Sequence, residues 1–389
     1  MIPIKFVQLF PISQQTHNGF NESTQTYAAD ASLIGSQDLI KNAKGQVQTR
    51  TVDGKSLNYK YDKAGRVTDI LDPENGVTTT VYDNAGRKTS VSDVNSGTTS
   101  YTYDAVGNIQ TQTDARGITT TFVYDSLNRP KSVSYSNGEG NTVLTYDEGG
   151  QAKYALGRLT TVVDDAGKLE LGYDIKGNRI YQRRTIDDLV VLFKRTYDLQ
   201  SRLASTTYPD GTKVYQKYAS TGHFSGITMD TADGSSKGYT VGSYTGPVIE
   251  NGQFKIIRET GNGVKMEIQY DPIKRRPIGL VTKLASGNIE SATSYTYDQK
   301  SNITQIADTI VNGRTQDFVY DAQNRLTQAS GKYGVENYTY TDNGNLTKRG
   351  QFTLAYGDAN HKHAVTAVTS PNTGTFNYAY DKAGNMISH

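Results

Sequence analysis

A short motif, Tyr-Asp-x-x-Gly-[Arg/Asn]-apolar, recurs along the chain from residue 61 to the C-terminal end. Its first four copies (YDKAGRV, YDNAGRK, YDAVGNI and YDSLNRP) begin at Tyr61, Tyr82, Tyr103 and Tyr124, at a constant interval of 21 residues. A fixed interval of about 20 to 50 residues is typical of stacked repeats, in which each unit packs on its neighbours. A residue that recurs with the motif is therefore first explained by the structure of the repeat, before a catalytic or binding role is considered for it.

The chain contains thirteen copies of this motif. The nine later copies begin at Tyr146, Tyr173, Tyr197, Tyr218, Tyr270, Tyr297, Tyr320, Tyr340 and Tyr380. Their spacing runs from 20 to 27 residues, apart from two wider gaps of 52 and 40. The motif keeps its own length while the segments between motifs vary, which indicates a fixed turn joined by variable loops.

Each motif position has a physical reason. Asp follows Tyr in eleven of the thirteen copies, with Ala219 and Thr341 as the exceptions, and its carboxylate can accept backbone N–H groups two residues on. Three residues later the chain must adopt positive φ, which Gly accepts freely and Asn tolerates. That position holds Gly65, Gly86, Gly107, Gly150, Gly177, Gly222, Gly344 and Gly384, then Asn128 and Asn324, with Ser201, Lys274 and Ser301 departing. The motif therefore predicts a hairpin loop made of a type I turn and a glycine bulge.

The segments on either side of the turn alternate as β-strands do. In TTSYTYD, for example, Thr99, Tyr101 and Tyr103 share one face. A second turn closes each unit, as in DPENG from Asp72 and DVNSG from Asp93. One hairpin alone is marginal in water, but stacked hairpins gain cross-strand pairs of roughly 0.2 to 1 kcal/mol each. The sequence thus predicts an all-β fold, a long antiparallel sheet of repeated hairpins.

The residues on which this prediction depends are structural repeat-turn residues. They are Tyr61, Asp62, Gly65, Tyr82, Asp83, Gly86, Tyr103, Asp104, Gly107, Tyr124, Asp125, Asn128, Tyr173, Asp174, Gly177, Tyr320, Asp321, Asn324, Tyr380, Asp381 and Gly384.

Composition agrees with short strands and tight turns and excludes several function classes. The chain has 28 Tyr and 38 Gly, and only 35% of its residues are hydrophobic. Its formal net charge of +2 gives no electrostatic footprint for nucleic acid or an anionic membrane. The absence of Cys excludes disulfides, thiol catalysis and thiolate metal sites, and is compatible with export. No run of about 18 apolar residues occurs, so no membrane-spanning helix is expected.

The chain divides into two parts. Residues 1–40 carry no clear copy and are expected to form an irregular N-terminal lead-in, and the only plausible helical stretches are short ones near residues 31–40. The opening segment MIPIKFVQLFPISQQ lacks a convincing cleavage site, so we interpret it as an ordinary segment or the start of a fragment. Residues 41–389 form one repeat array. Within it, residues 225–269 lose the motif but stay strand-like, which favours degenerate repeats over an inserted domain.

These motifs closely resemble the YD, or Rhs (rearrangement hotspot), repeat family over about five-sixths of the chain. The stretches YGDANHKHAVTAV and FNYAYDKAGNM, from Tyr356, also resemble the segment that precedes the core region of bacterial members. The resemblance implies a spiralling β-sheet that forms part of a hollow shell. Bacterial members use such shells to enclose a C-terminal toxin domain, and the related teneurins carry similar shells on animal cell surfaces.

In toxin-bearing members, paired Asp residues in a core motif, Asp-Pro-x-Gly, carry out self-cleavage. That motif does not occur in this chain. Asp271-Pro272 and Asp72-Pro73 lie inside repeats and lack the surrounding Gly pattern, so no catalytic role is transferred to them.

Three other patterns have some features of a binding site. His361 and His363 would place both imidazoles on one face of a strand as a metal pair, or serve at a loop or strand end. The run from Asp342 to Asn345 has some features of a calcium loop but lacks its spaced carboxylates and Glu, and turn geometry explains the recurring Asp better. The tyrosine stripes could stack on sugar rings or pack the thin sheet, and packing is favoured. We assign no catalytic, cofactor-binding or metal-binding residue and expect no enzyme.

Two functions remain open on the sequence. The first is a structural shell of a bacterial Rhs-type toxin, secreted or at the cell surface, whose partner is a C-terminal toxin or other passenger polypeptide. The second is a surface adhesion module that binds glycans or proteins through Tyr-rich strands. Neither involves nucleic acid, and the chain shows no recognisable signal peptide.

Overall fold

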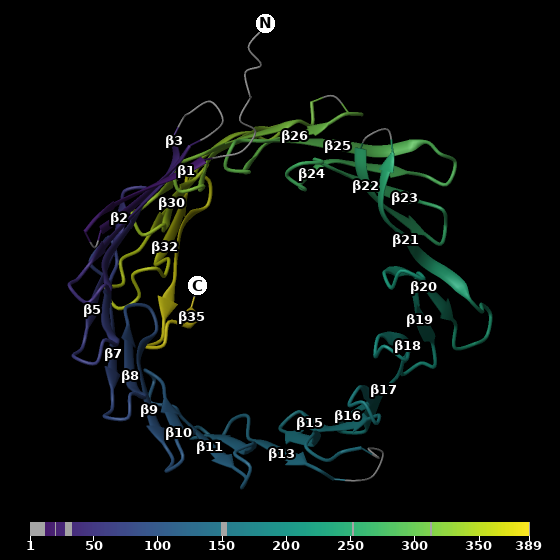
Figure 1. Cartoon of the computed structure of the whole chain (residues 1–389), viewed down its shortest axis with the longest axis horizontal. Helices are drawn as coiled ribbons and strands as arrows, with labels where there is room; N and C mark the ends of the chain where they lie inside the picture. The colour runs from purple at the N-terminus through teal and green to yellow at the C-terminus, as the bar shows by residue number, and fades with distance from the viewer. Residues whose placement is uncertain are drawn as a thin grey trace, which may run out of the picture. The chain divides into compact units, whose positions relative to one another are not determined.

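A computed structural model describes residues 12–19, 21–27, 33–148, 154–250, 253–311 and 313–388. All regular secondary structure in these residues is β, with 33 strands in one long antiparallel sheet and two more in a small second sheet (Figure 1). No helix among the described residues is long and apolar enough to cross a membrane. The predicted all-β fold of repeated antiparallel hairpins is confirmed.

The chain forms two compact units. Unit 1 comprises Met1–Thr119, Thr296–Ala307 and Gly313–His389, and unit 2 comprises Thr120–Tyr295 and Asp308–Asn312. We call residues 41–119 of unit 1 the early repeats and its residues from 296 onward the late repeats.

The strands that lie wholly or mainly in unit 1 are β1 (Ile12–Asn18), β2 (Asn21–Tyr27), β3 (Leu33–Lys41), β4 (Val47–Val52), β5 (Lys55–Tyr61), β6 (Val67–Leu71), β7 (Val77–Tyr82), β8 (Lys88–Asp93), β9 (Gly97–Tyr103), β10 (Ile109–Thr113), β26 (Ile303–Asp308), β27 (Gln316–Tyr320), β28 (Leu326–Gly331), β29 (Gly334–Tyr340), β30 (Leu346–Arg349), β31 (Phe352–Ala355), β32 (Ala367–Ser370), β33 (Gly374–Asn377), β34 (Ala379–Tyr380) and β35 (Met386–Ser388).

The strands of unit 2 are β11 (Thr119–Tyr124), β12 (Pro130–Tyr135), β13 (Thr142–Tyr146), β14 (Leu159–Asp164), β15 (Gly167–Tyr173), β16 (Arg179–Ile186), β17 (Leu189–Tyr197), β18 (Leu203–Thr207), β19 (Lys213–Tyr218), β20 (Phe224–Asp230), β21 (Tyr239–Glu250), β22 (Gln253–Thr260), β23 (Lys265–Tyr270), β24 (Pro277–Lys283) and β25 (Ile289–Tyr297).

Within each unit, strands pair antiparallel with the next one along the chain over most of the described sheet, so the turns alternate between two rims of the sheet. In the β5–β6 hairpin, for example, Asn58 pairs with Leu71 and Tyr61 with Val67. The rim that carries the Tyr-Asp motif turns is called the YD rim. The opposite rim carries turns such as residues 72–76 between β6 and β7 and is called the second-turn rim.

The N-terminal part differs from the sequence prediction. The short helix expected near residues 31–40 is wrong, because Leu33–Lys41 forms strand β3, paired with β2 and β4. The described residues before β3 also form strands, β1 and β2, which pair with each other. Polar and apolar residues alternate in Gln37, Asp38, Leu39 and Ile40 only imperfectly, and pairing with neighbouring strands overrides that weak local signal.

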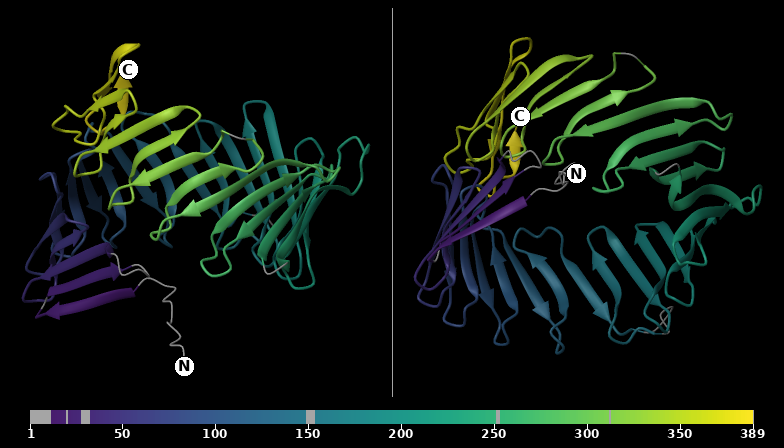
Figure 2. Two further views of the ribbon diagram at one scale, coloured as in Figure 1. Left: turned by 90° about the horizontal axis from the view of Figure 1, so that it is seen from above. Right: turned by 45° about the horizontal axis from the view of Figure 1, so that its top comes forward.

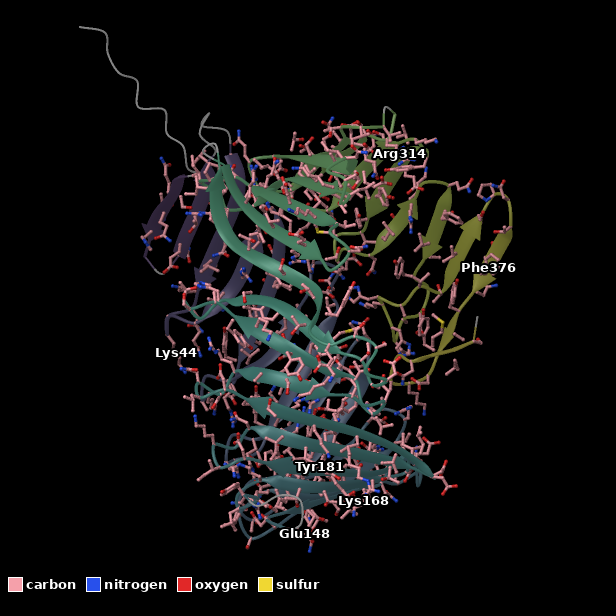
Figure 3. The ribbon with its side chains drawn as sticks, turned by 90° about the vertical axis from the view of Figure 1, so that its right-hand side faces the viewer. Lys44, Glu148, Lys168, Tyr181, Arg314 and Phe376 are labelled. Carbon is pink, nitrogen blue, oxygen red and sulfur yellow. The ribbon has the colours of Figure 1, made fainter. Side chains whose placement is uncertain are left out.

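The sheet has almost no conventional core. The buried hydrophobic residues in the described part of the chain are only Ala155, Leu171, Ala292 and Ala329, and none of its large side chains falls below 2% exposure. Side chains project from the sheet throughout, as Lys168 and Tyr181 do on neighbouring strands of unit 2 (Figure 3). Stability must therefore come from contacts between strands and between successive repeats, and these contacts define the site described next.

Candidate functional site

Most motif turns share one hydrogen-bond pattern, illustrated by the turn at Asp62. The copy at Tyr146 differs, since the N–H of Asp147 donates to the Arg158 carbonyl at 3.1 Å. The N–H of Gly65 donates to the Asp62 carbonyl at 3.0 Å, and the N–H of Asp62 donates to the Arg66 carbonyl at 3.0 Å. The strand register shifts by one residue between Lys60 and Tyr61, and Gly65 has φ 86°. This is a type I turn with a glycine bulge, and a residue with a side chain is strained at that φ.

The motif carboxylate organises the turn from inside. Asp104 accepts the backbone N–H groups of Val106 at 3.0 Å and Asn108 at 2.8 Å through Oδ1, while its Oδ2 accepts the Asn108 side chain at 2.9 Å. At Asp83 and Asp125, the N–H of the arginine four residues on lowers the pKa of the carboxyl below its ordinary value. These carboxylates stay ionised and fully engaged, which suits a turn and not a catalytic base.

Three turns that depart from the motif keep most of its geometry. Ser201 and Ser301 adopt positive φ of 62° and 71° although neither is Gly or Asn. Lys274 was aligned with this position, but Arg275 has the positive φ of 56° instead, because that loop is one residue longer. Gly150, the predicted turn glycine after Tyr146, lies outside the described residues.

In the copies that carry arginine after the positive-φ residue, this arginine links the repeat to the next one, a role that the sequence analysis missed. Arg66 donates from Nε to Asp62 Oδ2 at 2.6 Å and from its terminal nitrogen to the Asp83 carbonyl at 3.0 Å. Its guanidinium also lies 4.6 Å from the ring centre of Tyr82. The same stacking recurs, at 4.2 to 4.7 Å, for Arg87 on Tyr103, Arg129 on Tyr146, Arg202 on Tyr218 and Arg325 on Tyr340.

The motif tyrosines are anchored to the preceding repeat through their hydroxyl groups. The Tyr82 hydroxyl donates to the Val67 carbonyl at 2.9 Å. Val67 is the first residue of strand β6, which follows the previous motif turn. Equivalent bonds join Tyr61 to Val47, Tyr103 to Lys88, Tyr173 to Leu159, Tyr218 to Leu203, Tyr320 to Ile303, Tyr340 to Leu326 and Tyr380 to Val365. Phe could fill the same space but could not make this bond.

In unit 1, the YD rim of the late repeats docks on the second-turn rim of the early repeats. We call this contact the seam. Figures 1 and 2 show the late strands β30 and β32 alongside the early strands. Gln323 donates to the Asp53 carbonyl at 2.8 Å, and the N–H of Asn343 donates to Glu74 Oε1 at 2.9 Å.

Successive turns meet in step along the seam. After the turns at Gln323 and Asn343, the N–H of His363 donates to Asn95 Oδ1 at 2.9 Å. Beyond it, the guanidinium of Arg116 lies 3.7 Å from Asp381 Oδ2. From Gln323 onward, the turns of the late YD rim therefore meet the turns of the early second-turn rim in order along the chain.

Glycines allow the two rims to approach closely. A Cβ added to Gly384 would lie 2.5 Å from the Asn95 carbonyl oxygen, and one added to Gly97 would lie 2.7 Å from the Lys382 carbonyl oxygen. Ion pairs between Lys55 and Asp342, and between Lys300 and Asp53 at 4.0 Å, add to the contact. The seam thus combines backbone contact with hydrogen bonds and charge pairs.

The histidine pair lies at the seam and not on a strand. His361 and His363 occupy the loop between β31 and β32, which agrees with the loop or strand-end role and not with a metal pair on one strand face. His361 is 4% exposed and its Nδ1 lies 2.6 Å from Asp358 Oδ2, while His363 Nδ1 lies 2.5 Å from Asn345 Oδ1. No three potential metal ligands gather anywhere in the described part of the chain.

A cavity of about 800 Å³ lies beside His361 within the seam. Its lining includes Asp93, Asp114, Asp358 and Asp381. Each carboxylate already accepts a hydrogen bond from its own turn or from His361, and the pKa of each is lowered below its ordinary value. These groups are engaged in turn structure, and their arrangement does not resemble a general acid–base pair.

The residues predicted from the sequence are thus brought together in chains that run from repeat to repeat. Within a repeat, Asp62 and Gly65 shape one turn, whose Arg66 contacts Tyr82 of the next repeat. Asp381 and Gly384 of the last motif additionally contact the early repeats across the seam. The arrangement defines a β-repeat wall built by tyrosine–aspartate turns, the YD-shell class of protein.

The comparisons with known proteins agree with this class. The Teneurin YD-shell family model matches residues 42–240, just over half of the chain, and the chain belongs to that family. No curated protein matches it. The resemblance to YD repeats that the motifs indicate is therefore confirmed.

Solved structures of toxin complexes share the fold. The crystal structure of TcdB2-TccC3-Cdc42 matches with a TM-score of 0.75 at 16% identity, over 97% of this chain and 22% of that one. The crystal structure of TcdB2-TccC3 matches with a TM-score of 0.70 at 16% identity, over 97% and 22%. The Photorhabdus luminescens Tc holotoxin pore matches with a TM-score of 0.67 at 18% identity, over 95% and 20%. The chain thus spans about a fifth of the length of these structures.

Proposed function

We propose that the chain is a non-catalytic structural shell of a bacterial Rhs-type toxin, which sequesters and helps to deliver a C-terminal toxin polypeptide. The observation that carries the proposal is the seam, in which Gln323 and Asn343 of one rim bind backbone and carboxylate groups of the other. Where the two rims dock, the turns of each rim are covered by the other, as the wall of a container requires. Membership of the YD-shell family and the fold shared with Tc toxin structures support this role.

The motif residues serve this wall and not a reaction. Asp62, Gly65 and Arg66 are all used in holding one turn and the next repeat. We propose that the corresponding residues of the other copies act in the same way, and that the protein works outside the cytoplasm, secreted or at the cell surface. A passenger polypeptide is the proposed partner.

The rival function is adhesion through the tyrosine-rich strands. The hydroxyls of Tyr82 and Tyr340 already donate to backbone carbonyls. The guanidinium of an arginine from the preceding repeat also stacks on each of these two rings. These rings are therefore engaged in repeat packing, which disfavours their use as sugar platforms.

Protease protection tests the shell function. The gene is sequenced beyond the codon for residue 389, and the full gene product is treated with protease beside the isolated downstream polypeptide. We expect the downstream polypeptide to stay intact only when it is joined to the repeats. Equal degradation of the two, or a reading frame that ends at residue 389, would contradict the proposal. Binding of the isolated chain on a glycan array would favour adhesion.

A further inference from the structure

The seam is held by polar contacts between turn tips. Its hydrogen bonds, such as the one from the N–H of Asn343 to Glu74 Oε1 at 2.9 Å, join one turn to another and not one strand to another. Its ion pairs are open to water, since the side chain of Lys55 is 33% exposed and that of its partner Asp342 is 61% exposed. Exposed pairs of this kind contribute little to stability and are screened by salt.

The strands on either side of the seam are held by other contacts. In the early repeats β5 pairs with β6 and β7 with β8, and in the late repeats β27 pairs with β28 and β29 with β30. The arginine of one repeat also stacks on the tyrosine of the next, as Arg66 does on Tyr82 and Arg325 on Tyr340. Each of these contacts lies on one side of the seam, so parting the two rims leaves them intact.

Open clefts lie along the seam, lined by residues of both rims. The first, of about 400 Å³, is lined by Leu57 of the early repeats and Asn343 of the late repeats. The second, of about 510 Å³, is lined by Val52 and Asn324, and the third is the cavity of about 800 Å³ beside His361. A well-packed protein interior has few voids larger than a water molecule. The two rims therefore meet without filling the space between them.

Several buried polar atoms at the seam are unsatisfied. Oδ1 and Nδ2 of the Asn343 side chain, and Nε2 of His361, are buried and have no hydrogen-bond partner among the described residues. Asn343 lines the first cleft and His361 lines the third. A buried polar atom without a partner is unfavourable, because it has lost its hydrogen bonds to water. Separation of the rims would hydrate these atoms, which favours the open state.

We propose that the seam is a gate. It opens when the late YD rim leaves the early second-turn rim, and it closes when the rim returns, while both parts of the sheet stay folded. Openings of this kind require less free energy than global unfolding, because the contacts that part are polar and partly exposed. The proposal concerns unit 1 alone and does not rest on the proposed toxin function.

Hydrogen exchange of the full chain, resolved by residue and corrected for intrinsic rates, tests the gate. The backbone N–H groups of Asn343 and His363 donate across the seam, whereas that of Gly344 donates to the Thr341 carbonyl within its own turn. The first two should exchange about tenfold faster than the third, or more. Their exchange should quicken further in about 1 M salt, where the Debye length falls to about 3 Å. Equal protection of all three N–H groups in low and high salt would overturn the proposal.

A variant of Asn343 distinguishes a gate from fraying of a single turn. Asn343→Ala removes the unsatisfied amide and keeps the backbone N–H that donates to Glu74. Ala already stands at the same turn position at Ala64 and Ala383, so the turn tolerates the change. The closed seam should be favoured, and exchange should slow about fivefold or more at His363, which lies at the next contact along the seam. Unchanged or faster exchange at His363 would overturn the proposal.

A change in the opposite direction completes the test. Glu74→Gln removes the charge that accepts the Asn343 N–H, and it should speed exchange at His363 about threefold or more. The matched control is Glu139→Gln, at an exposed turn of the second-turn rim in unit 2, which should leave exchange at His363 unchanged. The N–H groups of β5 and β29 should exchange at the wild-type rate in every variant. Strand exchange that rises together with exchange at His363 would indicate general unfolding and would overturn the gate.

Discussion

The guanidinium of Arg66 lies 4.6 Å from the ring centre of Tyr82, although the two residues belong to different repeats. Arg66 also donates to Asp62 in its own turn, at 2.6 Å. One side chain therefore completes a turn and holds the tyrosine of the next hairpin. Since the sheet has so few buried residues, links of this kind carry much of what keeps successive repeats together.

Replacing Arg66 by Asn separates these two roles. Asn at this position can still bond the motif Asp, as Asn108 does with Asp104. It cannot stack on Tyr82, so Arg66→Asn should destabilise the chain by about 1 kcal/mol in urea unfolding. Lys63→Asn, at an exposed position of the same turn, should change stability by less than about 0.5 kcal/mol. Equal effects of the two changes would contradict the link.

The tyrosine hydroxyl is tested by Tyr320→Phe. The variant loses the 2.9 Å bond to the Ile303 carbonyl but keeps the ring. The expected loss is about 1 kcal/mol of unfolding free energy, the usual net value of one hydrogen bond. Tyr333→Phe serves as control because Tyr333 is 54% exposed. If both variants unfold at the same urea concentration as wild type, the hydroxyl contributes nothing.

Two glycines at the same turn position separate turn strain from the seam. Gly107 and Gly384 have φ of 97° and 81°, but an added Cβ meets nothing within 4 Å at Gly107, whereas at Gly384 it would lie 2.5 Å from the Asn95 carbonyl oxygen. Gly107→Ala should cost about 1 to 2 kcal/mol from backbone strain alone. Gly384→Ala should in addition speed hydrogen exchange at residues 93–97. Unchanged exchange there would argue against the seam.

Acid should weaken the array through its turn carboxylates. The N–H groups of Arg87 and Arg129 hold the pKa of Asp83 and Asp125 below the ordinary value of about 3.9. The unfolded chain therefore takes up protons at a higher pH than the folded one. The stability these groups confer is complete above about pH 4 and is lost as the pH falls through their folded pKa values.

The measurement is the urea midpoint as a function of pH. It should be steady near neutrality and fall below about pH 4. Asp83→Asn should be less stable than wild type at pH 7, and the difference between the two should shrink in acid. A difference that stays constant down to pH 2 would show that Asp83 is not bound in its ionised form.

The sequence predicted the repeat hairpin because its signals are local. Asp62 and Gly65 act within five residues, and the need for positive φ at Gly65 follows from the turn alone. The same reasoning placed Ser201 and Ser301 at the right position without their residue type indicating it. It failed at Lys274, where one added residue moved the positive φ to Arg275.

Contacts between repeats could not be derived in this way. The Arg66–Tyr82 stacking depends on the side-chain positions of two hairpins, although the fixed choice of Arg or Asn after the turn Gly was a signal that the position matters. The seam joins residues such as Asn343 and Glu74, 269 positions apart, and no local pattern encodes which turn meets which. A loop position for His361 and His363 was open on the sequence, but the bond from the His363 N–H to Asn95, 268 positions away, had no local signal.

The stepwise match of turns at the seam sets a rule for how this gene can change in length. Adding or removing one hairpin pair anywhere in an array keeps every neighbour link intact, since each link reaches only the next repeat. Within the early repeats, however, the same event would shift the partner of Asn343 from Glu74 to a different turn. A change in the number of repeats therefore leaves the contacts between neighbouring repeats in place. Within the early repeats it would change which turns meet at the seam, and the contacts there would be lost.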